Sequence, residues 1–247
     1  MIVGLDHVVV VVPDLAGAVA LYEALGFVVA PGGRHSTGTH NALIGLADGT
    51  YIELVAFETP NPAHRWWPAL ALGGGLVDVC LRSDAITEDC VRLERAGVPM
   101  GAPRAMSRRR PDGVVVSWTL GIPSPPFGGV VPFLIQDITL VGDRCPPPGD
   151  HGNGVMGIRS VRWETGAMSG WSARFAALAE AAAGAPGTGG SPFRVAAGPA
   201  MLELGEAEEL AEGARLAALV LRSADGPAMV LDGEATGNVR MEIAPLP

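Results

Sequence analysis

Basic residues and cysteines are scarce in this chain, and each scarcity excludes a class of protein. Lys and Arg number 17 against 26 Asp and Glu, which gives a formal net charge of −9. Because an acidic surface repels phosphate backbones, nucleic acid is excluded as a partner. The three cysteines, Cys80, Cys90 and Cys145, are an odd number without metal-like spacing. They indicate neither a disulfide framework nor a cysteine-based metal site.

Long apolar runs are also missing. No uninterrupted run reaches the ~18 residues of a membrane span, and the N-terminus lacks the basic segment of a signal peptide. We therefore expect a soluble cytoplasmic protein without a membrane partner, and the sequence leaves monomer and homodimer open. Hydrophobic residues make up 48% of the chain and charged residues 17%, which is typical of a globular protein.

The best-formed stretch of the sequence runs from residue 5 to residue 57. Leu5–Val12 is a nearly continuous β-branched run and predicts a strand buried on both faces. Asp14 is placed to cap a helix over Leu15–Leu25, and Gly26 ends that helix. Three strands are then expected, at Phe27–Ala30, His40–Leu46 and Thr50–Phe57.

The order strand, helix, strands recurs along the chain. A second copy covers residues 75–140, and the run Cys145-Pro146-Pro147-Pro148-Gly149 is interpreted as a hinge. Two weaker copies follow. We therefore predict an α+β fold of repeated βαβββ modules, with one domain over residues 1–142 (modules about 1–58 and 75–140) and a degenerate second half over 151–247.

Two segments of the first module resemble a known family. LDHVVVVVPDLAGAVALYEALGFVV resembles the start of a module in the vicinal-oxygen-chelate superfamily, which includes glyoxalase I, extradiol dioxygenases and bleomycin-resistance proteins. PGGRHSTGTHNALIGLADGTYIELVAF is similar to the glyoxalase-like domain subgroup. The resemblance implies modules that pair into half-open, barrel-like sheets around one small-molecule site.

His7 in the first strand and Glu53 in the fourth have the chemistry of a divalent metal site. An imidazole nitrogen and a carboxylate on adjacent strands suit Zn, Ni, Mn or Fe(II). An ionised Glu53 within an apolar strand is costly unless it is paired or ligated. The alternatives are a core histidine and a Glu53 paired with an arginine such as Arg65. The resemblance favours metal ligation, and Glu53 would also move a substrate proton.

The partner module matches the metal-dependent members of the superfamily poorly. In those members it supplies further ligands from its own first and last strands. Here the position expected to match His7 is near Asp78. The last strand of the module offers Gln136 or Asp137 where a glutamate is expected.

A second polar concentration lies at residues 34–41. Its glycines let the chain bend closely around a ligand, and its polar side chains offer directed hydrogen bonds from the rim of a strand. A surface loop is the alternative. The predicted substrate contacts are Thr39, His40, Asn41, Trp118 and Gln136.

The basic run Arg108-Arg109-Arg110 stands beside Pro111-Asp112-Gly113. This context favours a solvated loop, and a clamp for an anionic ligand is the alternative.

Three functions remain open at this point. The first is a metal-dependent lyase, isomerase or dioxygenase with His7 and Glu53 at the metal. The second is a metal-free binding or resistance protein that sequesters a small molecule in a cavity lined by Trp66, Trp67 and Trp118. The third is a structural module whose second half only completes the fold.

Overall fold

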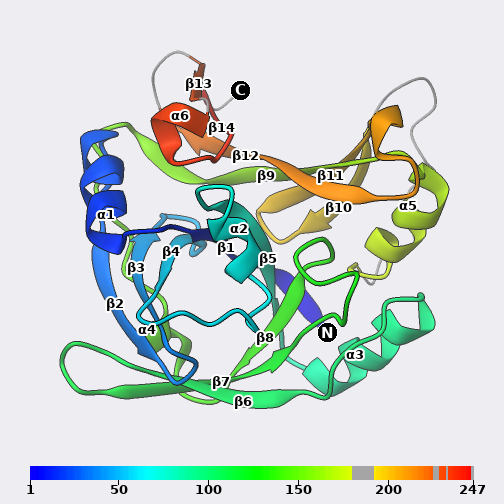
Figure 1. The fold of residues 1–247 in the computed structure, drawn as a ribbon, viewed down its shortest axis with the longest axis horizontal. Coiled ribbons are helices and arrows are strands. Elements are labelled where there is room, and N and C mark those ends of the chain that lie inside the picture. The colour runs from blue at the N-terminus through cyan, green and yellow to red at the C-terminus, as the bar shows by residue number, and fades with distance from the viewer. Residues whose placement is uncertain (180–191, 225–227, 232, 246–247) are drawn as a thin grey trace.

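The first half of the chain forms a closed barrel (Figure 1). The computed structural model describes residues 1–179, 192–224, 228–231 and 233–245. The barrel has eight strands in the order β1-β4-β3-β2-β6-β7-β8-β5. Their bounds are β1 Ile2–Val11, β2 Ala30–His35, β3 Thr39–Gly45, β4 Tyr51–Phe57, β5 Gly75–Ser83, β6 Arg104–Arg109, β7 Val115–Gly121 and β8 Phe133–Asp137.

Two modules build the barrel, as the sequence predicts, but their sheets close where half-open sheets are expected. Strands β1 and β5 pair antiparallel along most of their length and join the modules at one seam. At the other seam β2 pairs with β6 through only Arg34↔Arg109 and His35↔Arg108. The second seam is short, and it brings the end of β2 next to the basic run of β6.

Two helices cover the outer face of the barrel. Helix α1 (Leu15–Ala24) packs on β3 and β4, and α3 (Ile86–Arg95) packs on β7 and β8. Two short helices are α2 (Trp67–Leu70), whose Leu70 packs against the apolar cluster inside the barrel, and α4 (Val141–Arg144), which follows β8. The side chain of Asp14 accepts hydrogen bonds from Ala16 N at 3.2 Å and Gly17 N at 2.9 Å, so the predicted cap of α1 is confirmed.

Strand β1 shows how the sequence fills both faces of the barrel wall. Val8 and Val10 face outward and belong to an apolar core that joins the outer face, the helices and a second sheet. Val9 and Val11 face inward, where they pack with Val55. Val8, Val9, Val10 and Val11 are all fully buried, as is Val55. This explains why the run in β1 is apolar at every position and does not alternate.

The second half of the chain forms an open six-stranded sheet that lies across one side of the barrel (Figure 1). Its strand order is β10-β11-β9-β12-β14-β13. The elements are β9 Val155–Thr165, α5 Met168–Ala176, β10 Phe193–Ala197, β11 Ala200–Glu206, η1 Glu208–Leu210, β12 Ala214–Ser223, β13 Met229–Leu231, α6 Gly233–Thr236 and β14 Met241–Pro245. Each first strand of this half is followed by only two described strands, so its modules are reduced.

The linker between the halves is held against the barrel, although the sequence indicates a hinge. His151 Nδ1 accepts a hydrogen bond from Val28 N at 3.0 Å, and its Nε2 donates to Gly45 O at 2.9 Å. Gly45 must lack a side chain, since a Cβ there would lie 2.2 Å from the carbonyl oxygen of Pro147. The proline run therefore packs against the barrel, and His151 has a structural role.

The linker contacts predict a measurable contribution to stability. His151→Ala removes two buried hydrogen bonds and leaves a cavity, so we expect the free energy of unfolding to fall by about 2–4 kcal/mol. The control is His40→Ala, because the His40 side chain is half-buried and takes part in none of the side-chain hydrogen bonds found within the described part of the chain. Urea unfolding of both variants is the measurement. Equal losses in the two variants would contradict a docked linker.

No helix among the described residues is long and apolar enough to cross a membrane.

Candidate functional site

A cavity of about 500 Å³ opens into the barrel. Its polar side comes from the first module, with His7, His35, Thr39, Tyr51 and Glu53. The second module adds an apolar wall, formed by Met106, Trp118, Leu120, Phe133 and Ile135, together with the arginines Arg104 and Arg108. A small molecule in this cavity would therefore meet titratable groups on one side and an apolar wall on the other.

His7 and Glu53 lie next to each other at this cavity. Strand β1 pairs in parallel with β4, so that Val9 lies opposite Glu53 and His7 opposite Tyr51. Both functional side chains point inward, and His7 Nε2 lies 3.3 Å from Glu53 Oε2. They are 4% and 7% exposed, so their charges interact with little screening by solvent.

The other nitrogen of His7 is held by Asp6. His7 Nδ1 donates to Asp6 Oδ1 at 2.7 Å, and the ring stacks on Tyr51 with centroids 4.6 Å apart. A carboxylate on Nδ1 fixes the tautomer and leaves Nε2 directed at Glu53.

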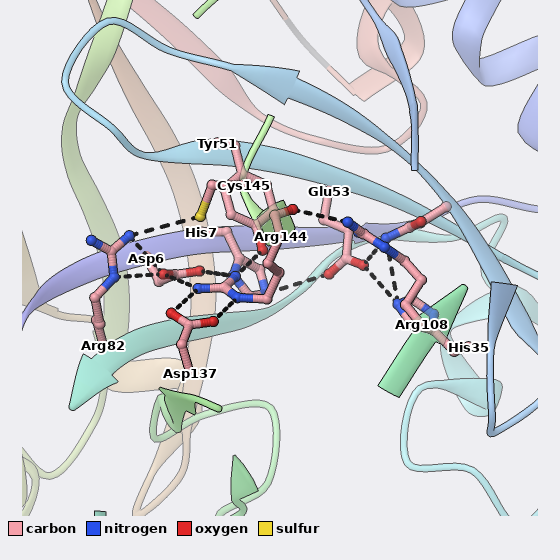
Figure 2. A network of polar contacts seen from close by, with 11 residues as sticks. Asp6, His7, His35, Tyr51, Glu53, Arg82, Arg108, Asp137, Arg144 and Cys145 are labelled. Atoms are coloured by element: carbon pink, nitrogen blue, oxygen red, sulfur yellow. Dashed lines mark hydrogen bonds and ion pairs between the residues drawn. The ribbon is translucent and has the colours of Figure 1, made fainter. Parts of the chain in front are cut away.

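Arg144 anchors Asp6 from the segment that follows β8 (Figure 2). Its two terminal nitrogens each donate to one oxygen of Asp6 at 2.8 Å, and it also donates to Tyr51 Oη at 2.7 Å. Asp137 accepts further hydrogen bonds from the same guanidinium, and Arg82 pairs with Asp6 at 2.8 Å. The network ties the first strand of the first module to the end of the second module.

The network sets the charges of the site. Burial alone would raise the pKa of Asp6, but the Arg144 guanidinium and the His7 hydrogen bond hold it well below its usual value. Burial disfavours a charged His7, yet Cys80, Asp6 and Glu53 together raise its pKa well above the usual value. Burial also opposes ionisation of Glu53, while the hydrogen bond from His7 lowers its pKa to about 2. His7 and Glu53 thus form an ion pair near neutral pH.

Three of the predicted substrate contacts converge on this pair. Asn41 Nδ2 donates to Glu53 Oε1 at 2.5 Å. Thr39 Oγ1 lies 2.9 Å from His35 Nδ1, and the ring of Trp118 meets that of His35 edge-on. All three side chains surround Glu53 or line the cavity beside it.

The other two predicted contacts lie elsewhere. His40 is on the opposite face of β3 from Thr39 and Asn41, because side chains alternate along a strand. Gln136 shares the outward face of β8 with Leu134 and bonds the backbone of Ile86 and Asp84. Neither residue lines the cavity. Trp66 lines it and Trp67 does not.

The residues of the second module that face His7 can be read from the strand pairing. His7 lies opposite Cys80 where β1 pairs with β5, and Cys80 lies opposite Phe133 where β5 pairs with β8. Asp78, the position predicted to match His7, accepts hydrogen bonds from Arg65 Nε and Trp66 Nε1 at the cavity wall. On the inward face beside His7, the second module therefore offers the thiol of Cys80 and the apolar side chains of Phe133 and Ile135.

Sequence reasoning missed several residues of the site, namely Asp6, His35, Tyr51 and Arg144, and it named Arg108 only within an alternative anion clamp. Asp6 and Tyr51 stood beside the named candidates, and inward alternation from Glu53 already placed Tyr51 on the same face. The prediction of a solvated loop is wrong for Arg108, which lies in β6 and is 4% exposed. Nothing in the sequence marked Arg144, because its role depends on how the barrel closes.

The donor atoms fit a divalent metal ion at His7 and Glu53. Two ligand atoms that share a metal at about 2.1 Å lie roughly 3.0–3.4 Å apart, which matches the 3.3 Å between His7 Nε2 and Glu53 Oε2. His35 Nε2 lies 3.5 Å from the other oxygen of Glu53. Asp6, His7 and Cys80 also place possible ligand atoms within 4.8 Å of one another, but the oxygens of Asp6 are already taken by Arg144 and Arg82.

Comparison with protein families identifies the fold. A family profile described as a glyoxalase-like domain matches residues 5–179. The chain belongs to the glyoxalase-like domain family. The predicted glyoxalase-like domain subgroup is therefore confirmed. Comparison with curated proteins gives no match.

Solved structures share the architecture of this glyoxalase-like protein at low sequence identity. A hypothetical protein from Staphylococcus aureus is 14% identical with a TM-score of 0.75, over 98% of this chain and 99% of that one. A mutant of 4-hydroxymandelate synthase from Streptomyces coelicolor is 13% identical with a TM-score of 0.60, over 99% and 93%. At such identities the likeness shows the fold alone.

The Arg144 network predicts a large effect on stability. Arg144→Met leaves the buried Asp6 and the half-buried Asp137 without this guanidinium, so we expect a loss of about 3–5 kcal/mol in the free energy of unfolding. Arg34→Met is the control, because the Arg34 side chain is 78% exposed and its pair with Glu58 should contribute less than about 1 kcal/mol. Chemical denaturation measures both. A loss below 1 kcal/mol in the Arg144 variant would show that the network is not structural.

Proposed function

We propose that this glyoxalase-like protein binds a small oxygen-containing molecule in the barrel cavity and converts it with the help of a divalent metal ion held by His7 and Glu53. The observation that carries the proposal is the 3.3 Å approach of His7 Nε2 and Glu53 Oε2 at a cavity, with Asp6 on the opposite nitrogen of the imidazole. A carboxylate behind a ligating histidine is a common feature of protein metal sites.

When bound, the metal ion would act as a Lewis acid that polarises an oxygen of the substrate. The residues of the chain prepare the site for this chemistry. Asp6 holds His7 with Nε2 facing the cavity, and Asn41 occupies Glu53 Oε1 so that Oε2 remains directed at His7. We assign Glu53 a second role, in moving a proton at a substrate carbon next to a polarised oxygen.

The substrate would lie between the polar and the apolar sides of the cavity. Thr39 and Asn41 orient its polar end from the rim of β3, while Trp118 covers its body and excludes water. His40 and Gln136 have no part in this proposal, because they lie outside the cavity. The reaction class is that of a lyase, an isomerase or a dioxygenase.

The second candidate is a metal-free protein that binds or sequesters a small molecule. A specific observation favours it: beside His7 the second module places the thiol of Cys80 and the apolar side chains of Phe133 and Ile135. Burial raises the pKa of Cys80 to about 11, so its thiol stays protonated and is a weak ligand at neutral pH. Among the described residues, the strong donors at this point are then His7, Glu53 and the neighbouring His35, all from the first module.

Metal analysis separates the two functions. Protein purified without added metal should contain a divalent ion near one equivalent, and His7→Ala and Glu53→Gln should each lower its affinity at least about tenfold. The control is His64→Ala, which changes another histidine at the cavity. Elemental analysis and titration of the chelated protein are the measurements.

Two results would contradict metal-dependent chemistry. One is substoichiometric metal that the His7 substitution leaves unchanged. The other is thermal stabilisation by small aromatic compounds but by no divalent ion, which would favour the binding protein.

A further inference from the structure

Arg108 carries a buried charge for which the described part of the chain supplies no carboxylate in an ion pair. It lies on β6 and lines the cavity, with 4% of its surface exposed. One terminal nitrogen donates to the backbone oxygen of Arg144 at 2.9 Å, and Nε is buried without a hydrogen-bond partner. None of the ion pairs found among the described residues includes Arg108.

Such a group is costly unless something else compensates it. A guanidinium stays charged in proteins, and an isolated charge in a protein interior loses much of its favourable hydration. Arg144 shows the usual solution, because it pairs with two carboxylates, the buried Asp6 and the half-buried Asp137. No ion pair of this kind is found for Arg108 among the described residues, and burial lowers the pKa of its guanidinium.

The wider cavity wall is also cationic. Four arginines line it, and Glu53 is the acid among the described lining residues. Arg65 is paired with Asp78 and Arg144 with Asp6, while Glu53 is balanced by His7. Arg104 and Arg108 remain without a carboxylate partner, in a chain whose formal net charge is −9. The cavity therefore attracts an anion that the rest of the surface repels.

The surroundings of Arg108 limit the shape of that anion. Met106 lies on the same face of β6, and Trp118 and Phe133 continue the apolar wall. A ligand that fits has one charged end for the guanidinium and an apolar body for the wall. Carboxylate is the group whose two oxygens match the planar fork of arginine.

We propose that the ligand of this cavity is a small carboxylate with an aromatic or alkyl body, whose carboxylate binds Arg108. The reactive end of this molecule rests on the function proposed above, because it must reach His7 and Glu53. The carboxylate subsite itself depends on Arg108 and not on a metal. Figure 2 shows Arg108 beside Glu53 and His35, and all three residues line the same cavity.

The test compares phenylacetate with its uncharged analogue phenylacetamide, using calorimetry on the full-length protein. After chelation of metals, phenylacetate should bind at least about tenfold more tightly than the amide. Arg108→Met should reduce this preference to within about twofold. Arg109→Met is the matched control, because the adjacent side chain is exposed and bonds Gly113 O outside the cavity. It should leave the preference unchanged.

The possible failures are distinguishable. Equal binding of acid and amide, no binding of the acid, or the same loss in the Arg109 variant would overturn the carboxylate subsite. Arg108-dependent binding of inorganic phosphate without binding of phenylacetate would also overturn it. A preference that needs metal and ignores Arg108 would refute the subsite and leave the proposed function standing. A preference that survives chelation, in a protein without a native metal, would support the subsite and refute the metal.

Discussion

The contact between Asp6 and Arg144 is the constraint on which the site depends. Arg144 reaches the first strand from the segment after the last strand of the barrel, so the contact forms only when both modules are in place. Asp6 in turn fixes the imidazole of His7, which meets Glu53 across β1 and β4. Arg82 of β5 also pairs with Asp6, so two arginines from beyond the first module hold the carboxylate that positions His7.

The second half of the chain has a related pair of polar residues on two paired strands. The register of β9 and β11 places Ser160 where His7 stands in the barrel and Glu203 where Glu53 stands. Ser160 Oγ still donates to Glu203 at 3.1 Å, but Arg162 now neutralises the carboxylate. A serine and a paired arginine leave no basis for a metal centre there. The second half of the chain keeps the strand order of a module, and Arg162 pairs there with Glu203 and Glu242.

Local chemistry made much of the fold predictable. The β-branched run of β1 and the cap at Asp14 follow from sequence, and inward alternation placed His7 and Glu53 together. Registers were not predictable, because β8 is apolar on both faces and β1 contains irregularities in its pairing with β5. For this reason the sequence points to Gln136 as a substrate contact, whereas Ile135 is the residue that lines the cavity. The role of Arg144 could not be predicted, since a four-residue helix acquires it only through tertiary closure.

The proposed function depends on a divalent metal ion that His7 and Glu53 hold together at the cavity. Crystals of the protein purified without added metal, measured above and below the absorption edges of Fe, Ni and Zn, test it most directly. We expect one anomalous peak within bonding distance of His7 Nε2 and Glu53 Oε2. This peak should disappear in His7→Ala crystals. Direct contact between the two side chains, with no anomalous peak after soaking in these metals, would contradict it.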